Sequence, residues 1–205
     1  MTKIITHPET EKEKTNFEQW YQSVPPWDIG RPQKVFVELE ERGLLLGKIL
    51  DVGCGTGENA LFLAEKGHHV WGIDFSPTAI RKAQEKAKQR SLNILFQTLD
   101  ALRLTEMGES FNVIIDCGLF HCFSNEERTL FVQQLYKSLT PNGTYHFLCF
   151  SDKENREGGP RRISKEEIES AFSNHWKIIS IEERIFENTL HPGGSRGYLV
   201  SLQKV

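Results

Sequence analysis

The chain has 205 residues, of which 26% are charged and 38% hydrophobic, and it carries a net charge of −3. This length and composition predict one globular domain with a substantial core. The slightly acidic balance excludes a general nucleic-acid binder, which would carry a basic face, and no apolar run approaches the ~20 residues of a membrane span.

An amphipathic helix is the first element expected along the chain. Phe17, Trp20, Tyr21 and Val24 recur at helical spacing after a polar start, which predicts a short helix from about Glu11 to Ser23. This helix either packs its aromatic face on the domain or forms a lid over a ligand. Two prolines follow it directly and are expected to end it.

The next segment, Pro26–Gln33, reads Pro-Trp-Asp-Ile-Gly-Arg-Pro-Gln and brings an aromatic residue, an acid and an arginine together. Its prolines and glycine disfavour a regular helix or a central strand. Trp27 could anchor the segment to the core, with Arg31 paired to Asp28. Alternatively, Trp27 and Arg31 could contact a ligand.

A glycine-rich turn follows the apolar strand expected at Lys48–Val52. The strand ends at Asp51-Val52, and glycines follow at positions 53, 55 and 57, immediately before a helical pattern. Such a turn builds the ligand crevice at the carboxyl edge of an open α/β sheet. The spacing differs from the dinucleotide fingerprint and lacks the Lys of a P-loop. Asp51 would repel a pyrophosphate but would suit a ligand ammonium.

The remaining pattern alternates strands with helices, which predicts a parallel sheet covered on both faces, and the final hairpin adds an antiparallel edge strand. Ser151–Arg162 is expected to be a long loop. Further strands are predicted at His69–Ile73, Ile94–Thr98, Asn112–Asp116, Thr144–Phe150, Trp176–Glu187 and Gly197–Lys204, and helices at about Pro32–Arg42, Glu58–Lys66, Pro77–Arg90, Glu126–Leu139 and Lys165–Phe172.

Asp74 closes the second strand, where a carboxylate faces the crevice of an open sheet. There it can accept both hydroxyls of a ribose, as an acidic residue does in dinucleotide-binding sheets. Phe75 could stack on adenine. The alternative is a carboxylate that only caps the helix beginning at Ser76-Pro77.

Two stretches together carry a family resemblance. Asp51–Gly57 resembles the first motif of class I S-adenosylmethionine-dependent methyltransferases, and Pro26–Gln33 resembles a segment of thiol, halide and thiopurine-type methyltransferases and their tellurite-resistance relatives. The resemblance covers nearly the whole chain. It implies a three-layer Rossmann-like α/β fold whose seven strands lie in the order 3-2-1-4-5-7-6, with strand 7 antiparallel, and S-adenosylmethionine as cofactor. Residues 1–205 would form one domain, with 1–30 as a lid and 31–205 as the catalytic core.

The resemblance also implies roles for individual residues. Trp27 would face the sulfonium by cation–π attraction and Arg31 would pair with the cofactor carboxylate. Asp100 and its neighbour would reach the adenine, and the loop after the fourth strand would run beside the methionine moiety. The expected cofactor-binding residues are Trp27, Arg31, Asp51, Gly53, Gly55, Gly57, Asp74, Phe75, Asp100, Ala101, Asp116 and Cys117.

His121 is the best candidate for a general base, although a lone loop histidine is more often a structural hydrogen-bond donor. Aromatic residues would form a pocket for a small hydrophobic or aromatic acceptor, unless they belong to the core. Two arginines would hold an anionic group or merely solvate their loop. The candidate acceptor residues are Trp20, Tyr21, Phe120, Phe123, Arg161 and Arg162.

We therefore expect methyl transfer to sulfur, oxygen or nitrogen of a small molecule. The chain lacks the Asp/Asn-Pro-Pro-aromatic run of amino-type nucleic-acid base methylators, which argues against nucleic acid as acceptor. A nicotinamide-dependent oxidoreductase is an alternative that the glycine spacing and Asp51 disfavour, and a non-catalytic S-adenosylmethionine-binding protein is another.

The four cysteines lie in or beside apolar runs, and Met1 to Lys14 lacks the apolar core of a secretory signal. Both observations predict reduced thiols in a cytoplasmic protein. Cys117, His121 and Cys122 are close in sequence, but no second pair at finger spacing accompanies them, so we predict no metal site. Either a monomer or a homodimer is compatible with the sequence.

Overall fold

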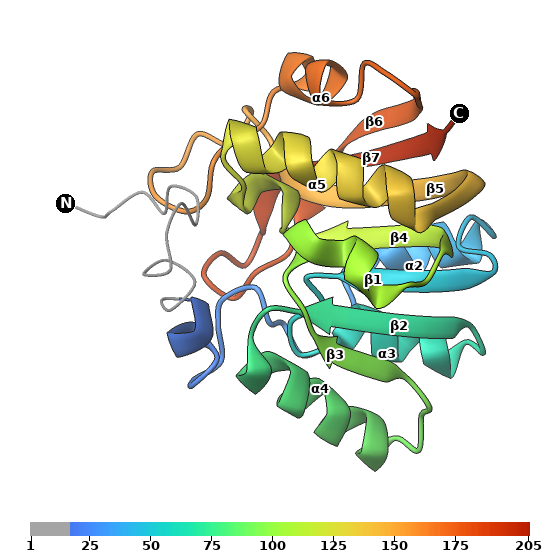
Figure 1. Ribbon diagram of the computed structural model, residues 1–205. Helices are drawn as coiled ribbons and strands as arrows, with labels where there is room; N and C mark the ends of the chain where they lie inside the picture. Colours follow the sequence, from blue (N-terminus) through green and yellow to red (C-terminus); the bar gives the residue numbers. More distant parts are fainter. Residues whose placement is uncertain (1–16) are drawn as a thin grey trace.

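The computed structural model describes residues 17–205, and its centre is one seven-stranded sheet (Figure 1). The strands lie in the order β3-β2-β1-β4-β5-β7-β6, which confirms the predicted order. β7 pairs antiparallel with β5 and β6, and the pairs among β1 to β5 are parallel. The strands are β1 (Lys48–Val52), β2 (His69–Asp74), β3 (Leu95–Thr98), β4 (Phe111–Cys117), β5 (Leu139–Phe150), β6 (Trp176–Phe186) and β7 (Ser195–Lys204).

Helices cover both faces of the sheet, and each face has its own apolar cluster. Side chains alternate along a strand, so Ile49 of β1 packs into one cluster and Leu50 into the other. No helix among residues 17–205 is long and apolar enough to cross a membrane. The first face carries α2 (Lys34–Glu41), α3 (Glu58–Glu65) and α4 (Pro77–Gln89); the second carries the 3₁₀ helix η1 (Ala101–Met107), α5 (Asn125–Ser138) and α6 (Lys165–Ala171).

Serine side chains fix the start of three helices. Ser76 Oγ accepts a hydrogen bond from Ala79 N–H at 3.0 Å, and a proline occupies the first turn of α4. Ser124 and Ser164 each form a reciprocal capping box with a glutamate three residues later. These bonds satisfy backbone donors that have no partner inside the helix, which is why polar residues end the preceding loops.

Some predicted boundaries differ from the structure. α2 begins at Lys34 with Gln33 as its N-cap, so Pro32 precedes the helix. β5 begins at Leu139 rather than at Thr144, because the chain pairs with β4 through a register shift and Asn142 adopts a positive φ of 61°. The part of the predicted helix Glu11–Ser23 before Phe17 lies outside the described residues. Residues 17–20 are helical and Tyr21 already lies in a turn.

The carboxyl edge of the parallel strands is where several loops meet. Residues 17–33, which we call the strap, lie at this edge beside the loop 151–164 and the turn 187–194, all on the left in Figure 1. Parallel strands all present their carboxyl ends at one edge, so the loops that follow β1, β2 and β4 converge there as well. The strap therefore crosses the place where an open α/β sheet binds its ligand.

Candidate active site

A cleft of about 1310 Å³ opens at the carboxyl edge of the sheet. Its walls come from the glycine loop after β1, the ends of β2 and β3, the loop after β4, the strap, and the two long C-terminal connections. The expected cofactor residues that line it are Trp27, Arg31, Gly53, Gly55, Gly57, Asp74, Phe75, Asp100, Ala101 and Cys117.

The glycine loop has a backbone conformation and a close neighbour that a side chain would not tolerate. Gly53, Gly55 and Gly57 have positive φ angles of 69°, 54° and 87°, a region that L residues with a Cβ rarely adopt. A Cβ on Gly55 would lie 2.9 Å from Tyr21 Oη of the strap. The strap therefore lies so close to the backbone of the glycine loop that there is no space for a side chain at position 55.

Asp74 lies at the end of β2 with its carboxylate nearly buried in the cleft wall. Oδ2 accepts from Gly55 N–H and Oδ1 from Ser76 N–H, each at 2.9 Å. A carboxylate has about four acceptor positions, so two remain for a ligand. Burial raises the pKa of Asp74 to about 6, while the two backbone donors lower it.

Asp51 lies below the cleft rather than on its wall. Among the described residues, neither carboxylate oxygen has a hydrogen bond of regular geometry, although the Ala60 N–H interacts weakly with it. Burial, and then the neighbouring charge of Asp116, raise its pKa to about 8. Its expected contact with the cofactor ammonium therefore stays a prediction.

Asp116 does not line the cleft, contrary to the expected contact with the cofactor. Its carboxylate accepts from Leu119 N–H at 2.7 Å, Phe120 N–H at 2.9 Å and Tyr145 O–H at 2.7 Å. Burial raises its pKa to about 7, although the three hydrogen-bond donors lower it. The side chain therefore holds the loop after β4 in shape, and Cys117 beside it lines the cleft.

Aromatic side chains of the strap pack on one another at the mouth of the cleft. Trp27 donates from Nε1 to Tyr21 Oη at 3.2 Å, and its ring lies 5.8 Å from the rings of both Phe17 and Trp20. Trp20 remains 40% exposed, whereas Tyr21 is buried. Both expected residues, Trp20 and Tyr21, thus line the cleft.

Arg31 lines the cleft but does not pair with Asp28. Its guanidinium forms two hydrogen bonds with Glu187, at 3.1 and 2.7 Å, and the pair raises the pKa of Arg31. A ligand carboxylate would have to compete with Glu187 or share the arginine with it. The expected contact with the cofactor carboxylate therefore stays a prediction.

His121 lines the cleft beside Phe150 and Phe186 and is almost fully buried. Its Nδ1 accepts from Phe150 N–H at 3.0 Å. A backbone N–H is always a donor, so a neutral His121 ring carries its proton on Nε2. Nε2 is then a donor, which matches the structural alternative better than a base that accepts a proton there.

The aromatic and basic residues around His121 differ from the predicted set. Phe120 is fully buried against Phe147 and Phe172, so it belongs to the core. Phe123 and Arg162 line the cleft as expected.

Arg161 does not line the cleft. It bonds to Asn125 at 2.7 Å and pairs with Glu167, which fixes the start of α6.

Phe150 and Phe186 are among the cleft residues that sequence reasoning missed. They lie at the ends of β5 and β6, and their rings are 5.0 Å apart. Each also faces the His121 ring, at 5.2 and 5.9 Å. In the sequence both look like ordinary last residues of apolar strands, so only the sheet order brings them to the site.

Comparisons with known proteins agree with this geometry. Residues 49–143 match the family described as a methyltransferase domain. The "2-heptyl-1-hydroxyquinolin-4(1H)-one methyltransferase" of Mycobacteroides abscessus is 36% identical over 168 residues, which cover 80% of this chain and 74% of that protein. The "Probable thiol methyltransferase 2" of Arabidopsis thaliana is 34% identical over 155 residues, 75% of this chain and 69% of that protein.

A solved structure is similar over nearly the whole chain. It is described as "Conversion of a Disulfide Bond into a Thioacetal Group during Echinomycin Biosynthesis" and has a TM-score of 0.84 at 34% identity. The match covers 93% of this chain and 92% of that one. The similarity therefore extends well beyond residues 49–143.

Proposed function

Because the chain belongs to the class I S-adenosylmethionine-dependent methyltransferases, we propose that it methylates a small aromatic or hydrophobic molecule whose acceptor atom is already anionic or soft. The fixed tautomer of His121 is the main support for this proposal. Its Nδ1 accepts from Phe150 N–H, so the neutral imidazole offers a hydrogen-bond donor at Nε2 and has no free lone pair with which to remove a proton. An acceptor that needs no base suits such a site.

The cofactor half of the cleft fits S-adenosylmethionine, which supplies a methyl group on a sulfonium. Two open acceptor positions on Asp74 suit the two ribose hydroxyls, and Phe75 and Asp100 line the wall beside them for the adenine. The glycine loop allows a ligand to approach its backbone. Trp27 lies where the ring face could meet the sulfonium.

The acceptor half is apolar with a cation at its edge. Phe123, Phe150 and Phe186 line it, and the guanidinium of Arg162 lies 6.0 Å from the Phe150 ring. An aromatic acceptor could pack on these rings while its negative charge faces Arg162. The residues thus orient the acceptor and exclude water, and alignment and desolvation can provide much of the acceleration of a methyl transfer.

Three similar proteins point the same way by their names. One acts on an N-hydroxyquinolone, one is described as a thiol methyltransferase, and one structure concerns conversion of a disulfide into a thioacetal. Thiols ionise near pH 8.5, so a useful fraction is anionic at neutral pH, whereas a phenol near pH 10 is mostly neutral. We also infer a reducing, cytoplasmic setting, supported by the four free thiols of the chain. The oligomeric state, monomer or homodimer, stays a prediction.

A matched pair of acceptors tests this proposal. A thiophenol and the phenol of the same ring substitution should differ in kcat/KM by at least the ratio of their anionic fractions, because the thiolate is also the softer nucleophile. The kcat/KM for each should rise with pH until the acceptor itself is ionised. If the phenol reacts at neutral pH as fast as the thiophenol, and His121→Ala removes the phenol activity alone, the enzyme uses a base and the proposal fails.

Arg162→Met provides a second readout. The variant should raise KM for anionic acceptors and leave KM for neutral ones of the same shape unchanged. Arg161→Met is the matched control, because that arginine bonds to Asn125 and Glu167 away from the cleft. Equal effects of the two substitutions would contradict the role of Arg162.

A further inference from the structure

The strap is attached to the domain on two sides. On one side, helix α4 binds it through long charged side chains. On the other side, Gln33, Arg31 and Pro26 bind the turn 187–194. These attachments matter because the strap residues Tyr21 and Trp27 line the cleft, so a movement of the strap changes the walls of the cofactor site.

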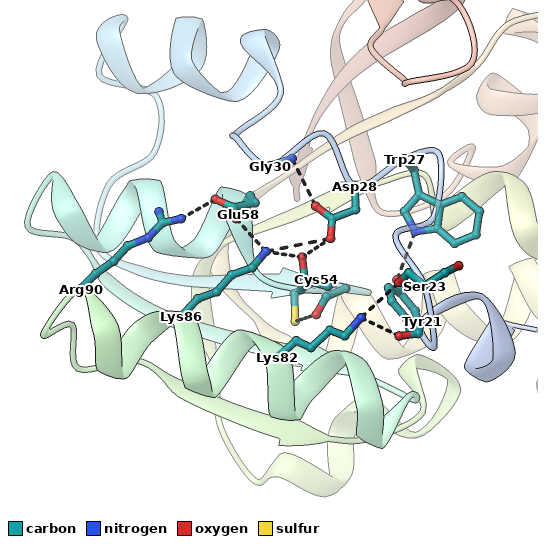
Figure 2. A network of polar contacts seen from close by, with 12 residues as sticks. Tyr21, Ser23, Trp27, Asp28, Gly30, Cys54, Glu58, Lys82, Lys86 and Arg90 are labelled. Carbon is teal, nitrogen blue, oxygen red and sulfur yellow. Dashed lines mark hydrogen bonds and ion pairs between the residues drawn. The ribbon is translucent and has the colours of Figure 1, made fainter.

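Two lysines of α4 hold the strap. Lys82 Nζ donates to the carbonyl oxygens of Tyr21 and Ser23, at 2.6 and 3.1 Å (Figure 2). Neither Lys82 nor Lys86 lines the cleft, so both act on the site through other residues. Glu18 adds a further contact to the same helix, since its carboxylate accepts from the hydroxyls of Ser76 and Thr78.

Lys86 lies at a junction between the strap and the glycine loop. Its Nζ is 2.7 Å from Thr56 Oγ1, 2.7 Å from Glu58 and 4.0 Å from Asp28, as Figure 2 shows for the labelled carboxylates. Thr56 in turn donates to Asp28 Oδ2 at 2.7 Å. Without Lys86, two carboxylates would face each other with only the Arg90–Glu58 pair to balance them.

The attachment to the turn 187–194 includes a buried amide and a backbone hydrogen bond. Gln33 is 3% exposed; its side chain donates to Glu187 O at 2.8 Å and accepts from Glu187 N–H at 3.0 Å. Pro26 O accepts from Thr189 N–H at 2.9 Å, and Arg31 adds an exposed ion pair with Glu187. Lys86 is 27% exposed, so water and salt reach its ion pairs. Because the turn side keeps the Gln33 and Pro26 bonds when ion pairs are screened, we expect release on the α4 side.

We propose that Lys82 and Lys86 are positioning residues that hold the strap closed over S-adenosylmethionine, and that the strap opens from α4 while Gln33 remains fixed. Closure brings Tyr21 onto Gly55 and places Trp27 over the cleft. Opening requires Nζ of both lysines to give up their strap contacts. The inference depends on cofactor binding and is independent of the acceptor.

Lys86→Met tests the proposal, with Lys88→Met as control because Lys88 lies exposed on the same helix and its side chain makes no hydrogen bond or ion pair with the strap among the described residues. S-adenosylhomocysteine is the probe. We expect Lys86→Met to raise its Kd by roughly 5- to 30-fold through faster dissociation, whereas Lys88→Met and Lys86→Arg should stay near the wild-type value. Equal Kd and dissociation rate in Lys86→Met and Lys88→Met would overturn the proposal.

Amide exchange and a double variant separate positioning from general loss of structure. In Lys86→Met with bound S-adenosylhomocysteine, exchange should speed up across residues 21–28 and stay unchanged at 33–36. Asp28→Asn/Lys86→Met should be no worse than Lys86→Met alone, since both act on one contact. Faster exchange throughout the chain, or fully additive effects, would contradict the mechanism.

The unmodified protein provides a test that needs no variant. Raising NaCl from about 0.05 to 0.5 M should speed S-adenosylhomocysteine dissociation, because the lysine contacts are partly exposed and screened by salt. A dissociation rate that does not change with salt would overturn the proposal even if a variant fails to fold.

Discussion

Deleting the Asp74 carboxylate should weaken cofactor binding by an amount that the structure allows us to estimate. Two of its acceptor positions are occupied by Gly55 and Ser76 N–H, which leaves two for the ribose hydroxyls. A hydrogen bond to a charged acceptor contributes about 1.5–3 kcal/mol. Asp74→Ala should therefore raise the Kd of S-adenosylhomocysteine by roughly 10²-fold or more.

The same substitution also removes partners from two buried N–H groups, at a cost of about 1–3 kcal/mol each. A fall in the thermal midpoint alone would therefore say little about the ribose. A 2′-deoxy analogue of S-adenosylhomocysteine provides the matched change on the ligand. It should bind the wild-type protein about tenfold more weakly than the parent compound, and the two should bind Asp74→Ala equally.

The pH dependence gives an independent check on Asp74. Burial raises its pKa to about 6, and hydroxyl donors favour the ionised form, so affinity should increase as pH rises through about 6 and then level off. Calorimetry across this range measures it. If the wild-type protein binds the deoxy analogue as tightly as the parent compound, Asp74 does not hold the ribose.

His121→Ala should lower kcat/KM by less than about tenfold and leave the pH profile unchanged, because the ring holds Phe150 N–H; a loss of 10²–10⁴ on hydroxyl acceptors alone would identify a base. Asp51→Asn should raise the thermal midpoint more at pH 8 than at pH 5. The pKa of Asp51 is raised to about 8, so the wild-type protein loses stability as pH rises from ~4 through 8. An equal rise in the thermal midpoint of the variant at pH 5 and pH 8 would contradict this. Gly55→Ala should weaken cofactor binding more than Gly67→Ala, since both glycines have positive φ but only Gly55 faces Tyr21 Oη; equal calorimetric affinities would refute the steric argument.

Most of the fold follows from local patterns in the sequence. β1 has the predicted bounds, and Ser76 with Pro77 begins α4 as the capping rules require. The errors occur where distant pairing overrides a local signal. Pro141-Asn142-Gly143 would ordinarily end an element, yet β4 and the bulge draw it into β5.

Most of the expected cofactor residues that line the cleft could be predicted because they lie at or just after the ends of β1, β2 and β3. Gly53 follows β1 and Asp74 ends β2, and parallel strands bring these ends to one edge. The residues of the acceptor half were harder to predict, because long-range contacts decide whether each side chain faces the core or the cleft. Phe120 faces Phe147 in the core while Phe150 faces the cleft, and no pattern in the sequence distinguishes these two phenylalanines.

The reversal of β7 also brings two C-terminal connections to the same end of the cleft. Because β6 ends at the carboxyl edge and β7 returns from it, the turn 187–194 joins the loop 151–164 around the proposed acceptor end. Residues 53–101 contribute most of the proposed cofactor end. Substitutions in the two C-terminal connections would therefore reshape the acceptor pocket without altering the glycine loop or Asp74.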